Sequence, residues 1–241
     1  MKEIIFSSPI SDYIEKPTPS LLKIPKSYKN MPNSWDKENI VFTPTVKKCI
    51  PFLDAMTIGY VITSPMEYLF KITEKVDGND KHIHFELFHE NVPEEFASII
   101  GHEHHNSQQV SKELRSNYRT IDAVPKFMNP WHIKTPPGYS CIFTTPFNRN
   151  LPFKIIDGVV DTDIYTMRIH FPYYWTQDIS KKETILPKGT PLALVIPFKR
   201  DSWKMKIKKC DFKEEEEAGM SYSQYLMDKY KRLFWKKKSY R

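Results

Sequence analysis

Three aspartates within a stretch of seven residues form the most concentrated group of potentially catalytic side chains in this sequence: Asp157, Asp161 and Asp163. On an extended strand, Asp161 and Asp163 would point to the same face because they lie two positions apart. Two close carboxylates can bind Mg²⁺, or one can raise the pKa of the other so that it acts as a general base. The alternative is structural: a turn at Asp157-Gly158, followed by acids that accept hydrogen bonds at a strand edge.

The segment 101–105, with the sequence GHEHH, is the densest group of imidazoles. Two of its histidines lie two positions apart, so on a strand they could bind a divalent metal together with the His-x-Glu pattern of residues 84–86. That pattern and a distant histidine also imitate the two-His-one-carboxylate site of non-haem iron enzymes. The alternative is an exposed polar strand face, since eight histidines produce short patterns by chance. The candidate metal ligands are His84, Glu86, His102, His104 and His170.

Aromatic residues gather near predicted strand ends. The run 171–175, FPYYW, ends in Trp175, and Trp131 and Trp203 lie beside other strands. Aromatic rings can stack on bases or sugars, which makes Trp131 and Trp175 candidate ligand-binding residues. The alternative is a place in the core or in a subunit interface. No Gly-x-Ser-x-Gly motif and no glycine-rich phosphate loop is present.

Short apolar strands and proline-glycine turns must position these residues. Residues 49–74 predict two strands broken at Ser64-Pro65, and residues 81–88 alternate between apolar and polar positions. Residues 91–100 predict a short helix that starts near Pro93. The sequence TPPG at 135–138 favours a type II turn, and the apolar run 192–196 indicates a strand buried on both faces.

Both ends of the chain differ from this β-rich region, which spans residues 46–212. Residues 1–45 are rich in proline, serine and lysine and predict an extended arm that wraps the domain or a neighbouring subunit. Residues 213–241 contain an acidic run, a predicted helix over 220–235 and a basic tail. Residues 200–241 hold 13 Lys/Arg and 7 Asp/Glu, so 13 − 7 = +6 of the net charge of +7 lies there. Such a tail can bind anionic partners or be a solvated terminus.

The cellular location follows from the cysteines and the hydropathy. The three cysteines are widely spaced and no Cys-x-x-Cys motif occurs, as expected in a reducing cytoplasm. The first residues lack the apolar run of a signal peptide, and no stretch reaches the roughly 18 apolar residues of a membrane span. We expect a cytoplasmic protein without a membrane partner.

The second half of the chain, residues 129–200, resembles the β-clip barrel of dUTP pyrophosphatases and dCTP deaminases. The resemblance is carried by FNRN at 147–150, GVVDTDIY at 158–165 and GTPLAL at 189–194. It implies a β-clip or jelly-roll-like barrel, in which Asp161 would activate water and Arg149 would contact phosphate. Asn148 beside that arginine, and Tyr165 in the place of the residue that packs on the sugar, are the implied ligand-binding residues.

The sequence departs from the β-clip enzymes at several phosphate and sugar contacts. Tyr165 comes one residue late, which on a strand places it on the opposite face unless a bulge intervenes. Met167 replaces a glycine and Leu194 replaces a phosphate-contacting glutamine, and the glycine-rich C-terminal motif is missing. Because each lost donor typically lowers the rate by about 10²–10³, several losses together predict little hydrolysis.

The whole chain is also similar to an uncharacterised protein family of marine tailed phages, through KKCIPFLDAMTIGYVI (47–62), NPWHIKTPPGYS (129–140) and YKRLFWKKKSYR (230–241). This similarity implies a viral origin, with the host cytoplasm as location, and supplies no activity.

Three functions follow from these residues. The favoured hypothesis is a non-catalytic binding or structural protein, a phage accessory or assembly factor of unknown ligand that forms a homo-oligomer, with a nucleotide or another anion as a candidate partner. The second is a divergent Mg²⁺-dependent nucleotide pyrophosphatase or deaminase relative, with Asp161, Asp163 and Arg149 as catalytic residues. The third is a non-haem iron oxygenase on a β-barrel, with iron held by His84, Glu86 and His170.

Overall fold

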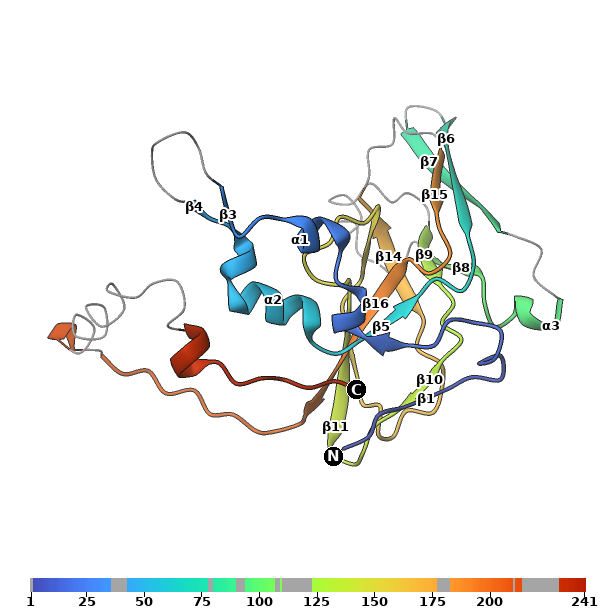
Figure 1. Ribbon diagram of the computed structural model, residues 1–241. Coiled ribbons are helices and arrows are strands. Elements are labelled where there is room, and N and C mark those ends of the chain that lie inside the picture. The colour runs from blue at the N-terminus through green and yellow to red at the C-terminus, as the bar shows by residue number, and fades with distance from the viewer. Residues whose placement is uncertain are drawn as a thin grey trace.

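The computed structural model describes residues 2–35, 43–77, 80–89, 94–106, 109, 123–176, 183–209, 211–213 and 230–241. Over these residues the chain is mainly β, as the strand-and-turn pattern predicted, and its strands form several antiparallel sheets (Figure 1). The helical elements are short: α1 (Lys26–Asn30), α2 (Ile50–Thr57), α3 (Glu94–Ala97), the 3-10 turns η1 (Ser20–Lys23) and η2 (Val46–Lys48), and the π-helical turn η4 (Tyr230–Phe234).

The largest sheet brings together strands from both ends of the chain. Its order is β13 (Gly158–Val160), β11 (Tyr139–Thr144), β16 (Pro191–Lys199), β5 (Tyr60–Thr63) and β2 (Thr18–Pro19). Strand β16 lies in the middle, paired with β11 on one side and β5 on the other. All of residues 192–196 are buried, as their continuous apolar run predicted.

Two further sheets and two strand pairs make up the rest of the β structure in the described residues. One sheet has the order β12 (Phe153–Ile155), β14 (Phe171–Trp175), β9 (Ala123–Phe127) and β8 (His102–Asn106). The other has the order β15 (Glu183–Leu186), β6 (Tyr68–Asp77) and β7 (Asp80–His89). The pairs are β1 (Ile5–Ser7) with β10 (His132–Lys134), and β3 (Ser34–Trp35) with β4 (Thr43–Pro44).

In the part of the chain that the structure describes, the strands do not close into the single barrel that the sequence predicted. Over the described residues the largest sheet ends at β13 and β2, and the second ends at β12 and β8. Closure requires continuous pairing around a ring with a consistent stagger. Edge strands of two or three residues, such as β2 and β13, give too short a ladder for this.

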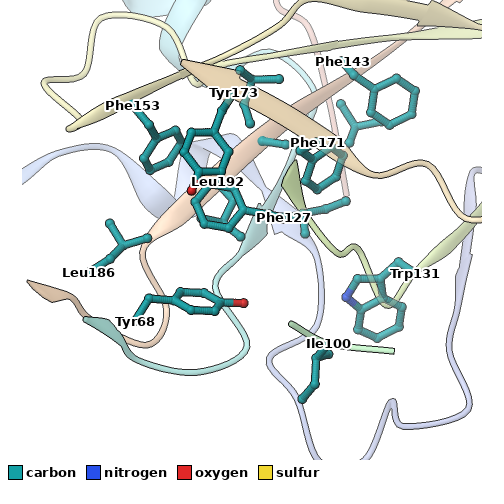
Figure 2. Close-up of a cluster of buried hydrophobic side chains, with 14 of the residues drawn as sticks. Tyr68, Ile100, Phe127, Trp131, Phe143, Phe153, Phe171, Tyr173, Leu186 and Leu192 are labelled. Atoms are coloured by element: carbon teal, nitrogen blue, oxygen red, sulfur yellow. The ribbon is translucent and has the colours of Figure 1, made fainter. Parts of the chain in front are cut away.

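An aromatic core lies between the sheets. Phe127 of β9 and Tyr173 of β14 stack with ring centroids 4.2 Å apart, and Phe153 of β12 meets Phe127 edge-on at 5.1 Å. Figure 2 shows these rings close together, with Leu186 and Leu192 from the neighbouring sheets nearby. Offset and edge-to-face pairs of this kind add about 0.5–1.5 kcal/mol each beyond the area they bury.

Residues 50–57 form helix α2, where the sequence predicted a strand. A short apolar run fits either structure by its pattern, and here Pro51 occupies the first helical turn, where its missing N–H is not needed. The chain leaves α2 through Gly59, whose φ is +71°. A Cβ atom at this position would lie 2.3 Å from the carbonyl oxygen of Val195, so only glycine lets the chain pass β16 this closely.

Other local predictions agree with the structure. The break at Ser64-Pro65 separates β5 from β6, and residues 81–88 lie within β7. The turn around Pro137 has Gly138 at φ +80° and a hydrogen bond from the Tyr139 N–H to the Pro136 carbonyl, as a type II turn requires. Helix α3 lies within the helix predicted for 91–100, of which residues 91–93 are outside the described part.

The two ends of the chain pack differently. Within the predicted arm, β1 pairs with β10, β2 pairs with β5, and Ile10 is 1% exposed in the core, so this segment lies on the β structure. Residues 201–209 are all exposed. Of the helix predicted for 220–235, residues 220–229 are outside the described part and 230–234 form the π-helical turn η4.

Candidate functional site

The predicted catalytic pair, Asp161 and Asp163, lies in the turn that follows β13. The Asp161 carbonyl oxygen accepts hydrogen bonds from the N–H groups of Ile164 and Tyr165, which close the turn. The carboxylate of Asp161 accepts a hydrogen bond from the Ser140 hydroxyl of β11 at 2.6 Å. Turn and side chain together place both aspartates beside the first residues of β11.

Arg200 engages both carboxylates. Its guanidinium forms a two-pronged contact with Asp163, with Nη1–Oδ1 at 2.8 Å and Nη2–Oδ2 at 2.5 Å, and lies 3.3 Å from Oδ1 of Asp161. The Gly138 N–H donates to Oδ2 of Asp163 at 2.8 Å. These hydrogen bonds hold the pKa of Asp163 well below its usual range, the Arg200 bond having the largest effect. Asp163 is therefore an ionised, fully engaged carboxylate that joins this turn to the turn at Gly138 and to the end of β16.

Arg149 lies at the other end of β11. Asp161 is tied to Ser140 near the start of that strand, whereas Arg149 belongs to the loop that follows Thr144 at its end. Ser140 and Thr144 are four positions apart on the strand, which corresponds to roughly 13 Å. The structure thus separates Arg149 from the two acids with which a catalytic site was predicted. The acid at this end is Asp157, which accepts a hydrogen bond from the Thr144 hydroxyl at 2.5 Å.

The loop that contains Arg149 forms one side of a cavity of about 500 Å³. Asn148 in this loop has a φ of +57°, a left-handed conformation. The Nε atom of Arg149 is buried and has no hydrogen-bond partner in the described part of the chain, and burial lowers the pKa of its guanidinium. The cavity lining is Thr144, Thr145, Pro146, Phe147, Asn148, Arg149, Asn150, Leu151, Phe153, Lys154, Asp157 and Thr176.

The chemistry of this cavity suits an anionic ligand. The half-buried guanidinium of Arg149 has lost part of its hydration, so it gains a charge-assisted hydrogen bond when a phosphate or carboxylate oxygen approaches its exposed part. Lys154 adds a second positive charge, and Phe147, 38% exposed, adds an apolar ring at the rim. We call this set of residues the Arg149 cavity.

The other predicted ligand-binding residues lie away from this cavity. Trp131 and Trp175 are each 3% exposed and belong to the core, where Trp175 packs against Phe70 at 4.8 Å. Tyr165 is 44% exposed, but it lies in the turn with Asp161, at the opposite end of β11 from Arg149. Asn148 is therefore the predicted ligand-binding residue that shares the cavity with Arg149.

The histidines of β8 are divided between two faces of its sheet. His102 and His104 lie on one face with ring centroids 4.7 Å apart, as their spacing predicted. His102 lies against the core, where its Nε2 and the Tyr173 hydroxyl share a hydrogen bond of 2.6 Å. Burial, and then the charge of His104, lower the pKa of His102 to about 3.

His170 lies on the opposite face. Its pKa is lowered to about 4, chiefly by burial and then by the charges of Lys126 and Arg168, and its other charged neighbours include Glu103. Its Nδ1 accepts a hydrogen bond from the backbone N–H of Asn129 at 3.1 Å. Within the described residues, no three His, Cys, Asp or Glu side chains come together to hold a metal ion.

The predicted metal ligands His84 and Glu86 lie on β7, opposite Thr73 and Lys71 of β6, and their side chains are outside the described part of the structure. Their role as iron ligands remains a prediction.

Sequence reasoning missed two functional partners. Arg200 engages the aspartate pair from 37 residues away in sequence, and no local pattern marks it. Asp157 was recognised as an acid, but not as part of the site of Arg149. Its position directly before β13, which pairs with β11, could have indicated that it lies near the end of β11.

Comparison with protein families, with curated proteins and with solved structures finds no match for this chain. The described residues contain no helix with the length and apolar character needed to cross a membrane.

Proposed function

We propose that this protein is a non-catalytic binding protein that works as a self-associated assembly factor and takes an anionic ligand in the Arg149 cavity. The observation that carries the proposal is the engagement of the aspartate pair. Arg200 and the Gly138 N–H occupy both oxygens of Asp163, and Arg200 and Ser140 contact Asp161. Asp163, held at both oxygens, supports a structural junction rather than a general base, which needs a free lone pair directed at its substrate.

The ligand class follows from the cavity. A volume of about 500 Å³ lies within the range of small-molecule sites, and its positive groups come from Arg149 and Lys154. Phosphate-bearing molecules, nucleotides among them, fit a half-buried guanidinium beside an exposed aromatic ring. The resemblance of 129–200 to β-clip enzymes supports the same ligand class, because their phosphate-binding arginine corresponds to Arg149.

A second candidate is a Mg²⁺-dependent nucleotide pyrophosphatase. In its favour is the presence of an acid, Asp157, in the same cavity as Arg149 and Asn148. Against it stands the separation of Asp161 and Asp163 from that cavity. The third candidate, an iron oxygenase with His84, Glu86 and His170, is tested by elemental analysis of the purified protein, and bound iron in stoichiometric amount would support it.

The biological setting that we propose is that of a phage accessory protein in the host cytoplasm, as the similarity to a phage protein family suggests. A β-clip or jelly-roll-like arrangement, an N-terminal arm and a C-terminal helix belong to the same proposal. The mainly β sheets of the described residues are compatible with it.

The test is calorimetric titration with inorganic pyrophosphate and with a panel of nucleoside triphosphates and Mg²⁺. We expect binding to at least one of them, weakened at least tenfold by Arg149→Ala. Arg168→Ala is the matched control, because Arg168 lies outside the cavity lining. Binding that is insensitive to Arg149→Ala, or no binding to any of these anions, would overturn the site. Release of pyrophosphate from a triphosphate would overturn the non-catalytic assignment.

A further inference from the structure

The last twelve residues of the chain dock on helix α2 and strand β5. We call residues 230–241 the tail. Trp235 of the tail donates its indole N–H to both carboxylate oxygens of Asp54, at 3.1 and 2.9 Å, and Lys238 forms an ion pair with the same carboxylate. Asp54 lies in α2 and its side chain is 18% exposed. One partly buried acid is thus saturated by two tail residues.

Strand β5 provides the second half of the docking surface. The Tyr60 ring meets that of Tyr240 edge-on at 5.8 Å, and its hydroxyl donates to the Arg241 carbonyl oxygen at 3.3 Å. Burial, first of all, raises the pKa of Tyr240. Charge, aromatic and hydrogen-bond contacts together make this a specific surface for the sequence of the tail.

Among the described residues, the segment that leads toward the tail contacts neither α2 nor β5; Asp201 pairs with the neighbouring Lys199, and all of residues 201–209 are exposed. Residues 201–209, which we call the connection, leave the end of β16 and extend away from the body of the molecule (Figure 1). Its apolar residues Trp203, Met205 and Ile207 alternate with lysines and are 92%, 83% and 83% exposed. This is the pattern of a β-strand with one apolar face, and in the described structure that face meets solvent.

The start of the connection is held firmly. Arg200 is fixed by Asp163, and its backbone N–H donates to the Gly138 carbonyl oxygen at 2.9 Å. The connection thus leaves from a fixed point, carries a row of exposed apolar side chains and leads to a specifically docked tail. These are the features expected of a segment that two copies of a chain exchange. The 29 residues from 201 to 229 can span at most roughly 95 Å, enough to reach a neighbouring molecule.

We infer that two copies of this chain exchange their tails, so that the tail of each copy docks on Asp54 and Tyr60 of the other. The contacts of the tail are the same within one chain and between two, so exchange loses none of them. It also brings the two connections alongside each other, where Trp203, Met205 and Ile207 of one copy meet those of the other. This inference rests on the self-association in the proposed function and names its mechanism.

The lysines of the connection predict how association depends on salt. Lys204, Lys206 and Lys208 lie on the opposite face from the apolar row, and two neighbouring connections place these like charges near each other. Salt screens this repulsion, with a Debye length of about 8 Å at physiological ionic strength. We therefore expect association to strengthen as the salt concentration rises, which is the opposite of what a nucleic-acid-binding lysine row shows.

The experiment combines two full-length variants, each defective in one half of the contact. Trp235→Ala disables the tail and leaves the docking surface intact; Asp54→Ala disables the surface and leaves the tail intact. Mass is measured by light scattering after size exclusion, for each variant alone and for an equimolar mixture. We expect the wild type at twice the 28.6 kDa of one chain, each variant alone as a monomer, and a restored dimer in the mixture. In the mixture, the intact tail of the Asp54→Ala copy can dock only on the intact surface of the Trp235→Ala copy. A restored dimer therefore requires that a tail crosses from one copy to the other.

A third variant tests the connection separately. Replacing Trp203, Met205 and Ile207 by serine should weaken dimerisation at least tenfold. The control is Leu22→Ser, which removes a similarly exposed apolar side chain, 66% exposed, from η1.

The outcomes separate the two proposals. If the wild type and both variants form dimers, or if the mixture of two monomeric variants stays monomeric, tail exchange is wrong while self-association can stand. If the wild type is a monomer, both tail exchange and the proposed self-association fail; a monomer that binds single-stranded DNA through Trp203 would assign the connection to nucleic acid instead. Anion binding by Arg149 is measured independently of all these results.

Discussion

His102 makes the stability of the fold depend on pH. Its ring packs against Phe127 and Tyr173, and shares a hydrogen bond with the Tyr173 hydroxyl. Burial and the neighbouring His104 lower its pKa from 6.5 to about 3, so the folded protein keeps this imidazole neutral well into the acidic range.

The direction of the effect follows from proton uptake. In the unfolded chain His102 binds a proton near pH 6.5, whereas in the folded chain it does so near pH 3. Below pH 6.5 the unfolded state therefore binds more protons, and the free energy of unfolding falls as the pH is lowered. The contribution is fully present above pH 6.5 and is lost progressively between pH 6.5 and 3.

The magnitude follows from the two pKa values. Each pH unit within this window changes the free energy of unfolding by about 1.4 kcal/mol. Between pH 7.5 and pH 5 the loss attributable to His102 is therefore about 2 kcal/mol. His170, with its own pKa lowered to about 4 and its ring half-buried, acts in the same direction, so the comparison must isolate His102.

The assay is urea unfolding of the wild type and of His102→Gln at pH 7.5 and pH 5, followed by tryptophan fluorescence. Glutamine keeps an oxygen that can accept the hydrogen bond of the Tyr173 hydroxyl, but it takes up no proton in this range. We expect the wild type to lose about 2 kcal/mol more than the variant between the two pH values. His132→Gln, which replaces a ring with an exposed hydrogen bond to the Thr166 carbonyl, controls for the loss of an imidazole as such. An equal loss in wild type and His102→Gln would refute the burial of a neutral His102.

Three further changes test the structural elements around the site. Asp163→Asn should lower the melting temperature more than Asp161→Asn, because the Asp163 side chain is 6% exposed and that of Asp161 52%; an equal fall in a thermal scan would contradict the junction. Gly59→Ala should lower the free energy of unfolding by more than about 1 kcal/mol in urea unfolding, since a Cβ would collide with the Val195 carbonyl at a positive φ. An unchanged free energy of unfolding would contradict the close approach of Gly59 to β16. Phe153→Ala should lower the free energy of unfolding by about 3–5 kcal/mol through the cavity it leaves in the aromatic core, and a loss below 1 kcal/mol would place this ring outside that core.

Local signals in the sequence predicted much of the β structure. The turn at Gly138, the break at Ser64-Pro65 and the buried run 192–196 are determined by neighbouring residues, because glycine and proline restrict φ and a continuous apolar run requires burial on both faces. The strand predicted at 50–57 was wrong for the same reason: a short apolar run fits a helix equally well, and Pro51 in the first turn decided for α2.

The candidate site depended on contacts that the sequence does not display. The spacing of Asp161 and Asp163 indicated a pair of acids, but the side chain that engages them, Arg200, follows a strand far along the chain. The sequence pattern predicted Arg149 and these acids in one site, and in the structure they lie at opposite ends of strand β11.

By itself, the sequence determined which residues turn, which are buried and which end of the chain is basic, because these properties depend on side chains within a few positions of each other. The tertiary structure alone decided that Asp163 pairs with Arg200, that Arg149 shares a cavity with Asp157, and that the tail docks on Asp54. Each of these contacts joins residues that are brought together by sheet pairing or by the return of the chain, and sheet order is set by the packing of the whole core.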